Sequence, residues 1–212
     1  CSASRAALLT GCYPNRIGLY GALGPNSPLG LNSSEETLPE LLKEQGYATG
    51  IFGKWHLGDR SQFLPLQHGF DEYYGVPYSH DMWPLHPAQA RAKYPTLHLI
   101  EGDKPGKAVN TLEDASELTG TFTQRAVQFI RNHKKEPFFL YIPHPLPHVP
   151  LAASARFRGK SSRGLFGDVM MELDWSVGQI LDEVKKQGLD KNTIVIFTSD
   201  NGPWLNYGDH AG

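Results

Sequence analysis

The sequence predicts an α/β domain whose mainly parallel sheet is sandwiched by helices. Predicted helices alternate along the chain with short, continuously apolar segments of strand length, the pattern of strands that are buried on both faces. The 212 residues, of which 40% are hydrophobic and 20% charged, suffice for one globular domain with a sizeable core. Several predicted strands also run directly into polar clusters, which gives the domain a candidate site.

The first half of the chain carries clear start and stop signals. Good helix formers at residues 4–9 are followed by Thr-Gly, which predicts a short helix and its end. Residues 18–33 are dense in Gly, Pro, Asn and Ser and predict a loop. Ser34 precedes two glutamates and three leucines at helical spacing, so we expect a helix over residues 34–46. Residues 47–52 then predict a strand.

The second half begins with a long irregular region. Residues 53–107 are rich in Pro, Gly, His and aromatic residues and predict functional loops. Residues 118–133 and 166–187 predict helices, and the apolar residues of the second share one face. Residues 137–142 and 193–197 are apolar and predict two buried strands.

Polar residues follow three of the predicted strands. They are Gly-Lys-Trp-His at 53–56, Pro-His-Pro-Leu-Pro-His at 143–148, and Ser-Asp-Asn at 199–201. Open α/β sheets bind their ligands beyond the carboxyl ends of the strands. We therefore expect the functional site where these three segments meet.

Composition excludes several kinds of partner. The net charge is −2 with acids and bases mixed along the chain, so we expect neither nucleic-acid binding nor a polybasic membrane patch. No apolar run approaches the length of a membrane span. Two cysteines are too few for a disulfide scaffold.

Cys1 and Arg5 lie four residues apart, which places them on one face if the segment is helical. A helix N-terminus favours an anion, and a guanidinium can bind an oxyanion through two donors. The alternative is a buried thiol beside a surface arginine, and spacing alone favours it.

The strand-end clusters have alternative interpretations too. Lys54 and His56 alternate along an expected extended segment, so both could face a bound anion, or they could be a solvated lysine and a structural histidine. Prolines stiffen the segment that carries His148. Asp200 and Asn201 offer oxygen ligands for a hard divalent cation, although Asn-Gly is also a strong turn dipeptide.

Taken together and in order, these segments resemble the sulfatase family. Residues 1–11 (CSASRAALLTG) are similar to the signature Cys-x-Pro-Ser-Arg followed by Thr-Gly. The resemblance continues in YPNRIG at 13–18, TLP to GY at 37–47, GKWHLG at 53–58, QHGFD at 67–71, PYSHD at 77–81, PH at 147–148 and DNG at 200–202. The segment at 77–81 is most similar to the arylsulfatase A type. The resemblance covers essentially the whole chain.

The resemblance implies an alkaline-phosphatase-like fold and hydrolysis of aryl or carbohydrate sulfate esters. A separate maturation enzyme would oxidise Cys1 to formylglycine, whose hydrate attacks sulfur and later expels sulfate as the aldehyde re-forms. Asp200 and Asn201, together with the modified Cys1, would bind calcium rather than magnesium. Arg5 would hold the formylglycine and neutralise charge.

The remaining implied roles concern sulfate binding and proton transfer. Lys54 and His148 would bind sulfate oxygens, and Lys54 could also reach the leaving oxygen. His56 would assist proton transfer from the hydrate, and Ser79 would contact sulfate. A substrate ring could be lined by Trp55, Tyr78, Met82, Trp83, His86 and Trp204, or these side chains could instead pack in the core.

The chain departs from the family pattern in three ways. Ala3 occupies the usual proline position of the signature. The family's N-terminal pair of calcium-binding aspartates would lie upstream of Cys1, and a further sulfate-binding lysine would follow Gly202. We therefore expect residues 1–212 to be part of an N-terminal catalytic domain, without its upstream strand and C-terminal part. We expect the longer parent protein to be exported and active, and this chain alone to be inactive.

Three other interpretations stay open. The same scaffold also supports hydrolysis of phosphate and phosphonate monoesters, which is an analogy of fold. If Ala3 blocks maturation, Cys1 stays a thiol and the protein is a non-catalytic binding protein. A cysteine hydrolase that uses a Cys1–His pair is the third interpretation.

Overall fold

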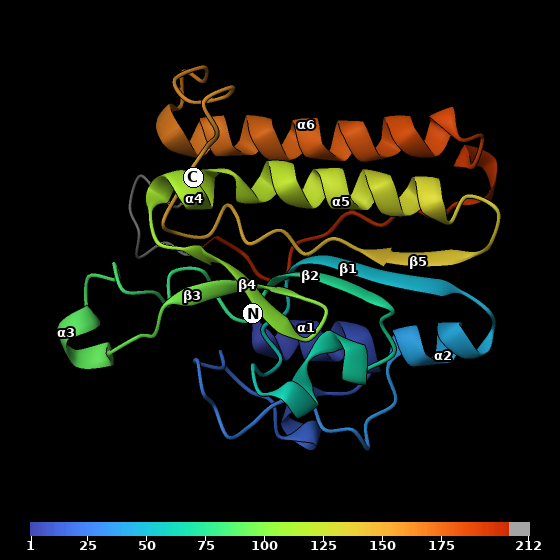
Figure 1. Cartoon of the computed structure of the whole chain (residues 1–212), viewed down its shortest axis with the longest axis horizontal. Coiled ribbons are helices and arrows are strands. Elements are labelled where there is room, and N and C mark those ends of the chain that lie inside the picture. The colour runs from blue at the N-terminus through green and yellow to red at the C-terminus, as the bar shows by residue number, and fades with distance from the viewer. Residues whose placement is uncertain (204–212) are drawn as a thin grey trace.

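The computed structural model describes residues 1–203, and its centre is a sheet of five strands in the order β4-β3-β2-β1-β5 (Figure 1). The strands are β1 (Ala48–Lys54), β2 (Glu72–Val76), β3 (Leu97–Glu101), β4 (Lys104–Val109) and β5 (Phe138–Tyr141). β1 pairs in parallel with β2 and with β5, whereas β3 joins β2 and β4 in antiparallel fashion. The predicted α/β class is confirmed, and its parallel part is the half of the sheet that contains β1.

Helices cover both faces of this sheet. On one face lies α5 (Leu118–Asn132), which contacts β1 and β2, and α6 (Gly164–Lys186) packs on the outer side of α5 (Figure 1). On the other face lie α1 (Ser2–Thr10) and α2 (Leu38–Glu44). The short elements within residues 1–203 are α3 (Gln89–Ala92), α4 (Leu112–Ser116) and the 3₁₀ turns η1 (Pro14–Ile17), η2 (Ser61–Phe63), η3 (Pro65–Gln67) and η4 (Asp190–Asn192).

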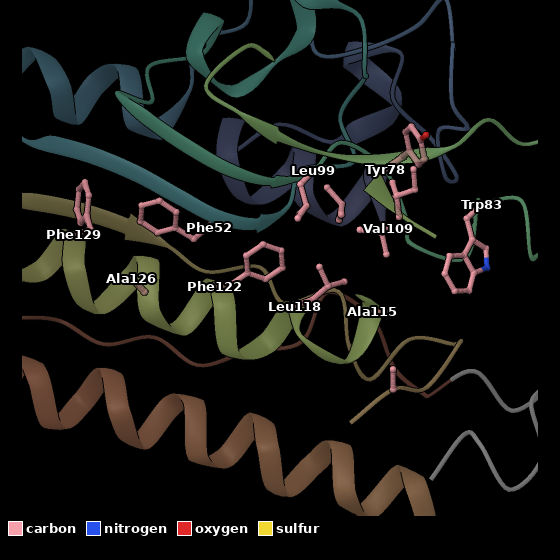
Figure 2. Close-up of a cluster of buried hydrophobic side chains, with 13 residues drawn as sticks. Phe52, Tyr78, Trp83, Leu99, Val109, Ala115, Leu118, Phe122, Ala126 and Phe129 are labelled. Carbon is pink, nitrogen blue, oxygen red and sulfur yellow. The ribbon is translucent and has the colours of Figure 1, made fainter. Parts of the chain in front are cut away.

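Two apolar clusters hold the sheet between its helical layers. Figure 2 shows the cluster on the α5 side, where Phe122, Ala126 and Phe129 of α5 face Phe52 of β1 and Leu99 of β3. The cluster on the other face joins α1 to the sheet, with buried side chains that include Ala6, Leu9, Ile51, Trp55 and Tyr73. Complete burial of such large side chains contributes roughly 1.5–3 kcal/mol each. The core therefore fixes α1, the helix that Cys1 directly precedes.

The predicted helix at 34–46 begins later than expected. Its N-cap is Thr37, not Ser34, because Thr37 and Glu40 form a reciprocal capping box and Pro39 stands in the first turn. The other helix predictions are confirmed. α1 ends at Gly11, which adopts the left-handed conformation (φ 67°), and α5 and α6 agree with the sequence to within two residues.

The prediction that residues 53–107 form loops is wrong for three segments. β2 and β3 lie wholly within that range, and β4 begins there. Residues 104–107 are exposed and include two lysines, so no apolar alternation marks this part of β4. These strands owe their formation to pairing with sheet neighbours that are distant in the sequence.

The prediction of a buried strand at 193–197 is also wrong. The segment is not a strand, and Ile194, Ile196 and Phe197 are 90%, 81% and 81% exposed. The strand predicted at 137–142 is present as β5, but it is an edge strand of half-buried residues and not a buried one, paired only with β1 among residues 1–203. An apolar segment becomes a strand only when a neighbouring strand accepts its backbone hydrogen bonds, and no described strand lies against residues 193–197.

Candidate active site

The carboxyl ends of the three parallel strands meet at one edge of the sheet. Lys54 N, at the end of β1, donates to Pro143 O beyond β5 at 2.7 Å. Trp55 N and His56 N donate to Val76 O and Pro77 O at the end of β2, at 2.9 and 3.0 Å. These hydrogen bonds join two of the polar segments that the sequence singled out, 53–56 and 143–148, as well as the segment that carries Ser79.

Gly53 makes this convergence possible. Its φ is 144°, a conformation that L side chains rarely adopt, and an added Cβ would collide with the carbonyl oxygen of Pro143. The absence of a side chain therefore lets the segment after β5 approach β1 closely. Lys54 and His148 are brought to the same edge as a result.

Cys1 is the N-cap of α1, as the helical interpretation of Cys1 and Arg5 required. Its Sγ lies 3.5 Å from Oδ1 of Asn201. Backbone N–H groups at a helix start point toward the capping residue and favour negative charge there. The start of the chain and the Asp-Asn motif, 200 positions apart, thus meet at one point.

Arg5 lies beside them on the first turn of α1 and is only 5% exposed. Its Nε and Nη2 donate to Oδ2 of Asp200 at 3.1 and 2.9 Å, and its Nη1 donates to the carbonyl oxygen of Lys54. Burial works to raise the pKa of Asp200, but the charge and hydrogen bonds of Arg5 outweigh it and hold that pKa below its usual range. The interpretation of Arg5 as a surface arginine is wrong.

Lys54 is 1% exposed, and its Nζ donates to Oγ of Ser79 at 3.1 Å. Burial, followed by the charge of Arg5, lowers the pKa of Lys54 from 10.5 to about 7. Ser79 is itself 2% exposed and follows β2. The buried lysine is therefore charged below about pH 7 and loses its charge above it. The alternative of a solvated lysine is wrong.

His56 is 1% exposed, and its backbone conformation differs from the expected extended one. Its backbone is left-handed (φ 65°), so the extended alternation with Lys54 is wrong. The ring Nε2 lies 2.9 Å from Leu23 O, and because a carbonyl can only accept, Nε2 carries the proton. Nδ1 is buried and has no hydrogen-bond partner within residues 1–203. Burial and the charges of Lys54 and Arg5 hold the pKa of His56 well below its usual value.

His148 lies in the segment after β5, with Nδ1 2.7 Å from the carbonyl oxygen of Val149. Burial lowers its pKa, and the charges of Asp81, Lys54 and Asp200 act on it as well. Its ring lies edge-on to that of His80, with centroids 6.0 Å apart. His148 therefore belongs to the same electrostatic cluster as Lys54 and Asp200.

The sequence interpretation missed His80 and Asp81. His80 is fully buried, its Nε2 lies 3.1 Å from the carbonyl oxygen of Pro150, and its pKa is lowered to about 4, chiefly by burial. The charge of Asp81 acts on both Lys54 and His148. The available signal was the run Ser-His-Asp at 79–81, three adjacent polar residues within one of the family-like segments.

The oxygen donors of the site only partly fit a calcium ion. Asp200 and Asn201 offer one carboxylate and one amide oxygen, and Oδ2 of Asp200 is already engaged by Arg5. Residues 1–203 hold no group of three His, Cys, Asp or Glu side chains that could bind a metal. Calcium takes six to eight oxygen ligands, so this donor set is insufficient by itself.

The aromatic residues near the site are mostly core residues. Trp55, Tyr78 and Trp83 are 1%, 6% and 3% exposed and belong to the two apolar clusters. Met82 packs against the cluster on the α5 side, and His86 is half-buried. For the three buried rings the core-packing alternative is confirmed; Trp204 lies outside the described residues.

The fold and this cluster define an α/β protein with a buried polar site at the carboxyl ends of its parallel strands. The Sulfatase family profile matches residues 1–212. The chain belongs to the sulfatase family.

Relatives and solved structures agree with this assignment. N-acetylgalactosamine-6-sulfatase from Mus musculus is 43% identical over 220 residues, which cover 97% of this chain and 42% of the relative. Arylsulfatase A from Bos taurus is 42% identical over 100% of this chain and 44% of the relative. The structure of Ps i-CgsB in complex with k-i-k-neocarrahexaose has a TM-score of 0.83 at 32% identity, over 98% of this chain and 49% of that one.

The chain spans less than half the length of these relatives. In the part of the chain that the structure describes, no helix is long and apolar enough to cross a membrane.

Proposed function

We propose that the parent protein hydrolyses sulfate monoesters at this site, with Cys1 as the precursor of the nucleophile. The observation that carries the proposal is the position of Cys1. It caps α1 next to a buried Arg5–Asp200 pair, at the strand edge where Lys54 and Ser79 meet. A thiol that was merely structural would not require two buried cations nearby, since each costs free energy to bury.

A sulfate would be bound by the side chains of Lys54, Arg5 and His148. Lys54 would bind sulfate oxygens through its ammonium group, and Ser79 holds that group in place. Arg5 is fixed by Asp200 and by the carbonyl of Lys54, so its charge is oriented before any ligand arrives. Preoriented charges in a dry site stabilise a developing oxyanion more than flexible ones do.

His56 is suited to accept a proton. Its Nε2–H is held by the carbonyl of Leu23, which leaves Nδ1 as the basic nitrogen. Its lowered pKa keeps the ring neutral near neutral pH, so Nδ1 keeps its lone pair, while burial and the charges of Lys54 and Arg5 make the protonated ring short-lived. We propose that His56 takes the proton released at the modified Cys1.

Two further components belong to the proposal. Formylglycine at position 1, made from Cys1 by a maturation enzyme, would supply a hydrate hydroxyl as nucleophile. We propose Asp200 and Asn201 as two calcium ligands in the parent protein, where residues outside this chain complete the set. Asn201→Ala should weaken calcium binding by about tenfold or more, measured by calorimetry, with the exposed Asn132→Ala as control. Equal calcium affinity in the two variants would argue against Asn201 as a ligand.

We propose a sulfated sugar as the substrate class. The Mus musculus relative is named for a sulfated amino sugar, and the Ps i-CgsB structure holds a neocarrahexaose. An aryl sulfate is the alternative, which the name of the Bos taurus relative supports. Rates of the parent protein on sulfated monosaccharides and on simple aryl sulfates decide between them.

The reaction itself is tested with matched esters. The parent protein, co-expressed with a formylglycine-generating enzyme, should hydrolyse an aryl sulfate faster than the corresponding aryl phosphate. A faster phosphate rate would instead support the phosphomonoesterase alternative. Peptide mass spectrometry of the same sample reports the state of Cys1. An unmodified thiol throughout would leave the non-catalytic binding role, whereas inactivation by thiol-alkylating reagents would indicate a cysteine hydrolase.

A further inference from the structure

The segment that carries His148 is anchored to α6 by buried polar side chains. This segment, residues 143–161 and hereafter the His148 loop, runs from the end of β5 to the start of α6. Asp168, Glu172 and Ser176 of α6 are 3%, 2% and 0% exposed. Their spacing of four residues places them on one face of the helix. Burying polar groups costs free energy unless each finds a hydrogen-bond partner.

All three side chains find partners in the His148 loop. The carboxylate of Asp168 accepts the backbone N–H groups of Gly159, Lys160 and Ser161 at 2.8, 2.9 and 2.7 Å. Glu172 Oε2 accepts Ser154 N at 2.9 Å. Ser176 Oγ lies 3.2 Å from Nε2 of His144. Successive turns of α6 therefore hold successive parts of the loop, from its end back to its beginning.

The contact at Ser176 belongs to a chain of hydrogen bonds in which each group donates to the next, from His144 to Ser176, Thr123 and Thr119. Thr123 of α5 donates its hydroxyl hydrogen to Thr119 O at 2.6 Å, and its oxygen lies 2.6 Å from Ser176 Oγ. Since each hydroxyl has one hydrogen, Ser176 donates to Thr123. Ser176 then accepts Nε2–H of His144. His144 is neutral near neutral pH, because burial lowers its pKa to about 4, so it has only this one ring proton to give.

Apolar packing also holds the loop. Leu146, Leu151, Ala153 and Phe157 form a cluster with Val169 of α6. Dispersion and hydrophobic contacts lack the directionality of hydrogen bonds. The loop is thus kept close to α6 by its apolar residues, and its orientation is fixed by the polar ones.

We propose that the polar face of α6, formed by Asp168, Glu172 and Ser176, positions His148. Ser176 acts through His144, which precedes His148 by four residues in the same loop. Asp168, Glu172 and Ser176 are then positioning residues, remote from the reacting atoms. The proposal rests on the proposed function insofar as His148 binds sulfate. It predicts that the hydroxyl at position 176 controls sulfate affinity without contacting sulfate.

The test compares Ser176→Ala and Ser176→Thr in the parent protein. We measure the affinity for inorganic sulfate by calorimetry, hydrogen–deuterium exchange of residues 143–161, and the melting temperature. Ser176→Ala should weaken sulfate binding by about tenfold or more and speed exchange around residues 144–150. Ser176→Thr keeps a hydroxyl and should restore both. Gln179→Ala, on the exposed side of α6, is the control and should change neither.

Thr123→Val provides a second variant if Ser176→Ala folds poorly. It removes the acceptor of Ser176 but leaves the contact with His144, so a smaller effect in the same direction is expected. Wild-type sulfate affinity together with wild-type exchange in either folded variant would overturn the proposal. A parent protein that neither binds sulfate nor hydrolyses its esters would instead overturn the proposed function. The exchange data would then still show whether Ser176 orders the loop.

Discussion

Arg5 and Asp200 are 195 positions apart in the sequence, yet two nitrogens of Arg5 converge on one oxygen of Asp200 at 3.1 and 2.9 Å. The arginine is 5% exposed and the aspartate 29%. This pair ties the first turn of α1 to the segment after α6. It thereby places the thiol of Cys1 and the amide of Asn201 in contact.

We expect Arg5→Met to lower the free energy of unfolding by about 2 kcal/mol, because it leaves a half-buried carboxylate without its counterion and hydrogen bonds. Urea titration of the parent protein measures the change. Arg125→Met removes an exposed pair with Glu101, in which the side chains are 44% and 61% exposed, and should cost less than about 1 kcal/mol. Equal losses in the two variants would show that Arg5 has no special role in stability.

Sulfate affinity should decrease as pH rises through about 7. Lys54 loses its proton there in the free protein, because burial and Arg5 lower its pKa, and a neutral amine binds the dianion weakly. Calorimetry across this interval reports the change. Lys54→Arg keeps its charge to higher pH and should remove the inflection at pH 7. A wild-type affinity that does not vary with pH would contradict the assignment of Lys54 to the sulfate.

The titration of Lys54 should affect stability in the opposite direction, because its loss of a proton weakens sulfate binding but favours the folded state. The unfolded chain keeps the lysine protonated up to its ordinary pKa of 10.5, while the folded protein releases the proton near 7. Between these values the unfolded state binds more protons, so the contribution of Lys54 to the free energy of unfolding rises with pH. Lys54→Met should flatten the pH dependence of stability in this window. Urea titrations of both proteins across the window measure it.

Gly53→Ala should destabilise the protein by about 3 kcal/mol, since its φ of 144° is strained for alanine and the new Cβ meets Pro143 O. Gly178→Ala is the matched control. Gly178 lies inside α6 with nothing within 4 Å of an added Cβ, so this change should stabilise by about 0.5 kcal/mol. Thermal unfolding separates the two, and shifts of the same sign would refute the close-approach argument.

Ala3→Pro should raise the fraction of Cys1 that is converted to formylglycine, because it restores the usual signature of the family. Ala3 is the second residue of α1, where the backbone N–H has no partner within the helix, so proline is tolerated. The unfolding free energy should stay unchanged. Ala7→Pro, in the interior of α1, should cost about 3 kcal/mol. Peptide mass spectrometry after co-expression measures conversion, and equal fractions with Ala3 and with the proline would contradict the prediction.

Local signals accounted for the helices α1, α5 and α6 and for the strands β1 and β5. α1, α5 and α6 have good helix formers, end signals and apolar faces within their own sequences, and β1 is a compact apolar run. β2, β3 and β4 were missed because their stability comes from pairing across the sheet. Residues 193–197 show the reverse case, an apolar run with no described strand to pair with. Burial on both faces cannot be inferred from apolarity when the neighbour is unknown.

The sequence by itself determined which residue types the site contains and their order: Cys1, Arg5, Lys54, His148 and the Asp-Asn pair. Only the tertiary structure decided their states. In the folded protein Lys54 is buried beside Arg5, and the backbone of His56 is left-handed. The tertiary structure also brought His80 beside His148 and placed the polar face of α6 against the His148 loop, and no local pattern marks that face of α6. The physical reason is that burial, charge and hydrogen-bond direction depend on neighbours that are distant in the chain.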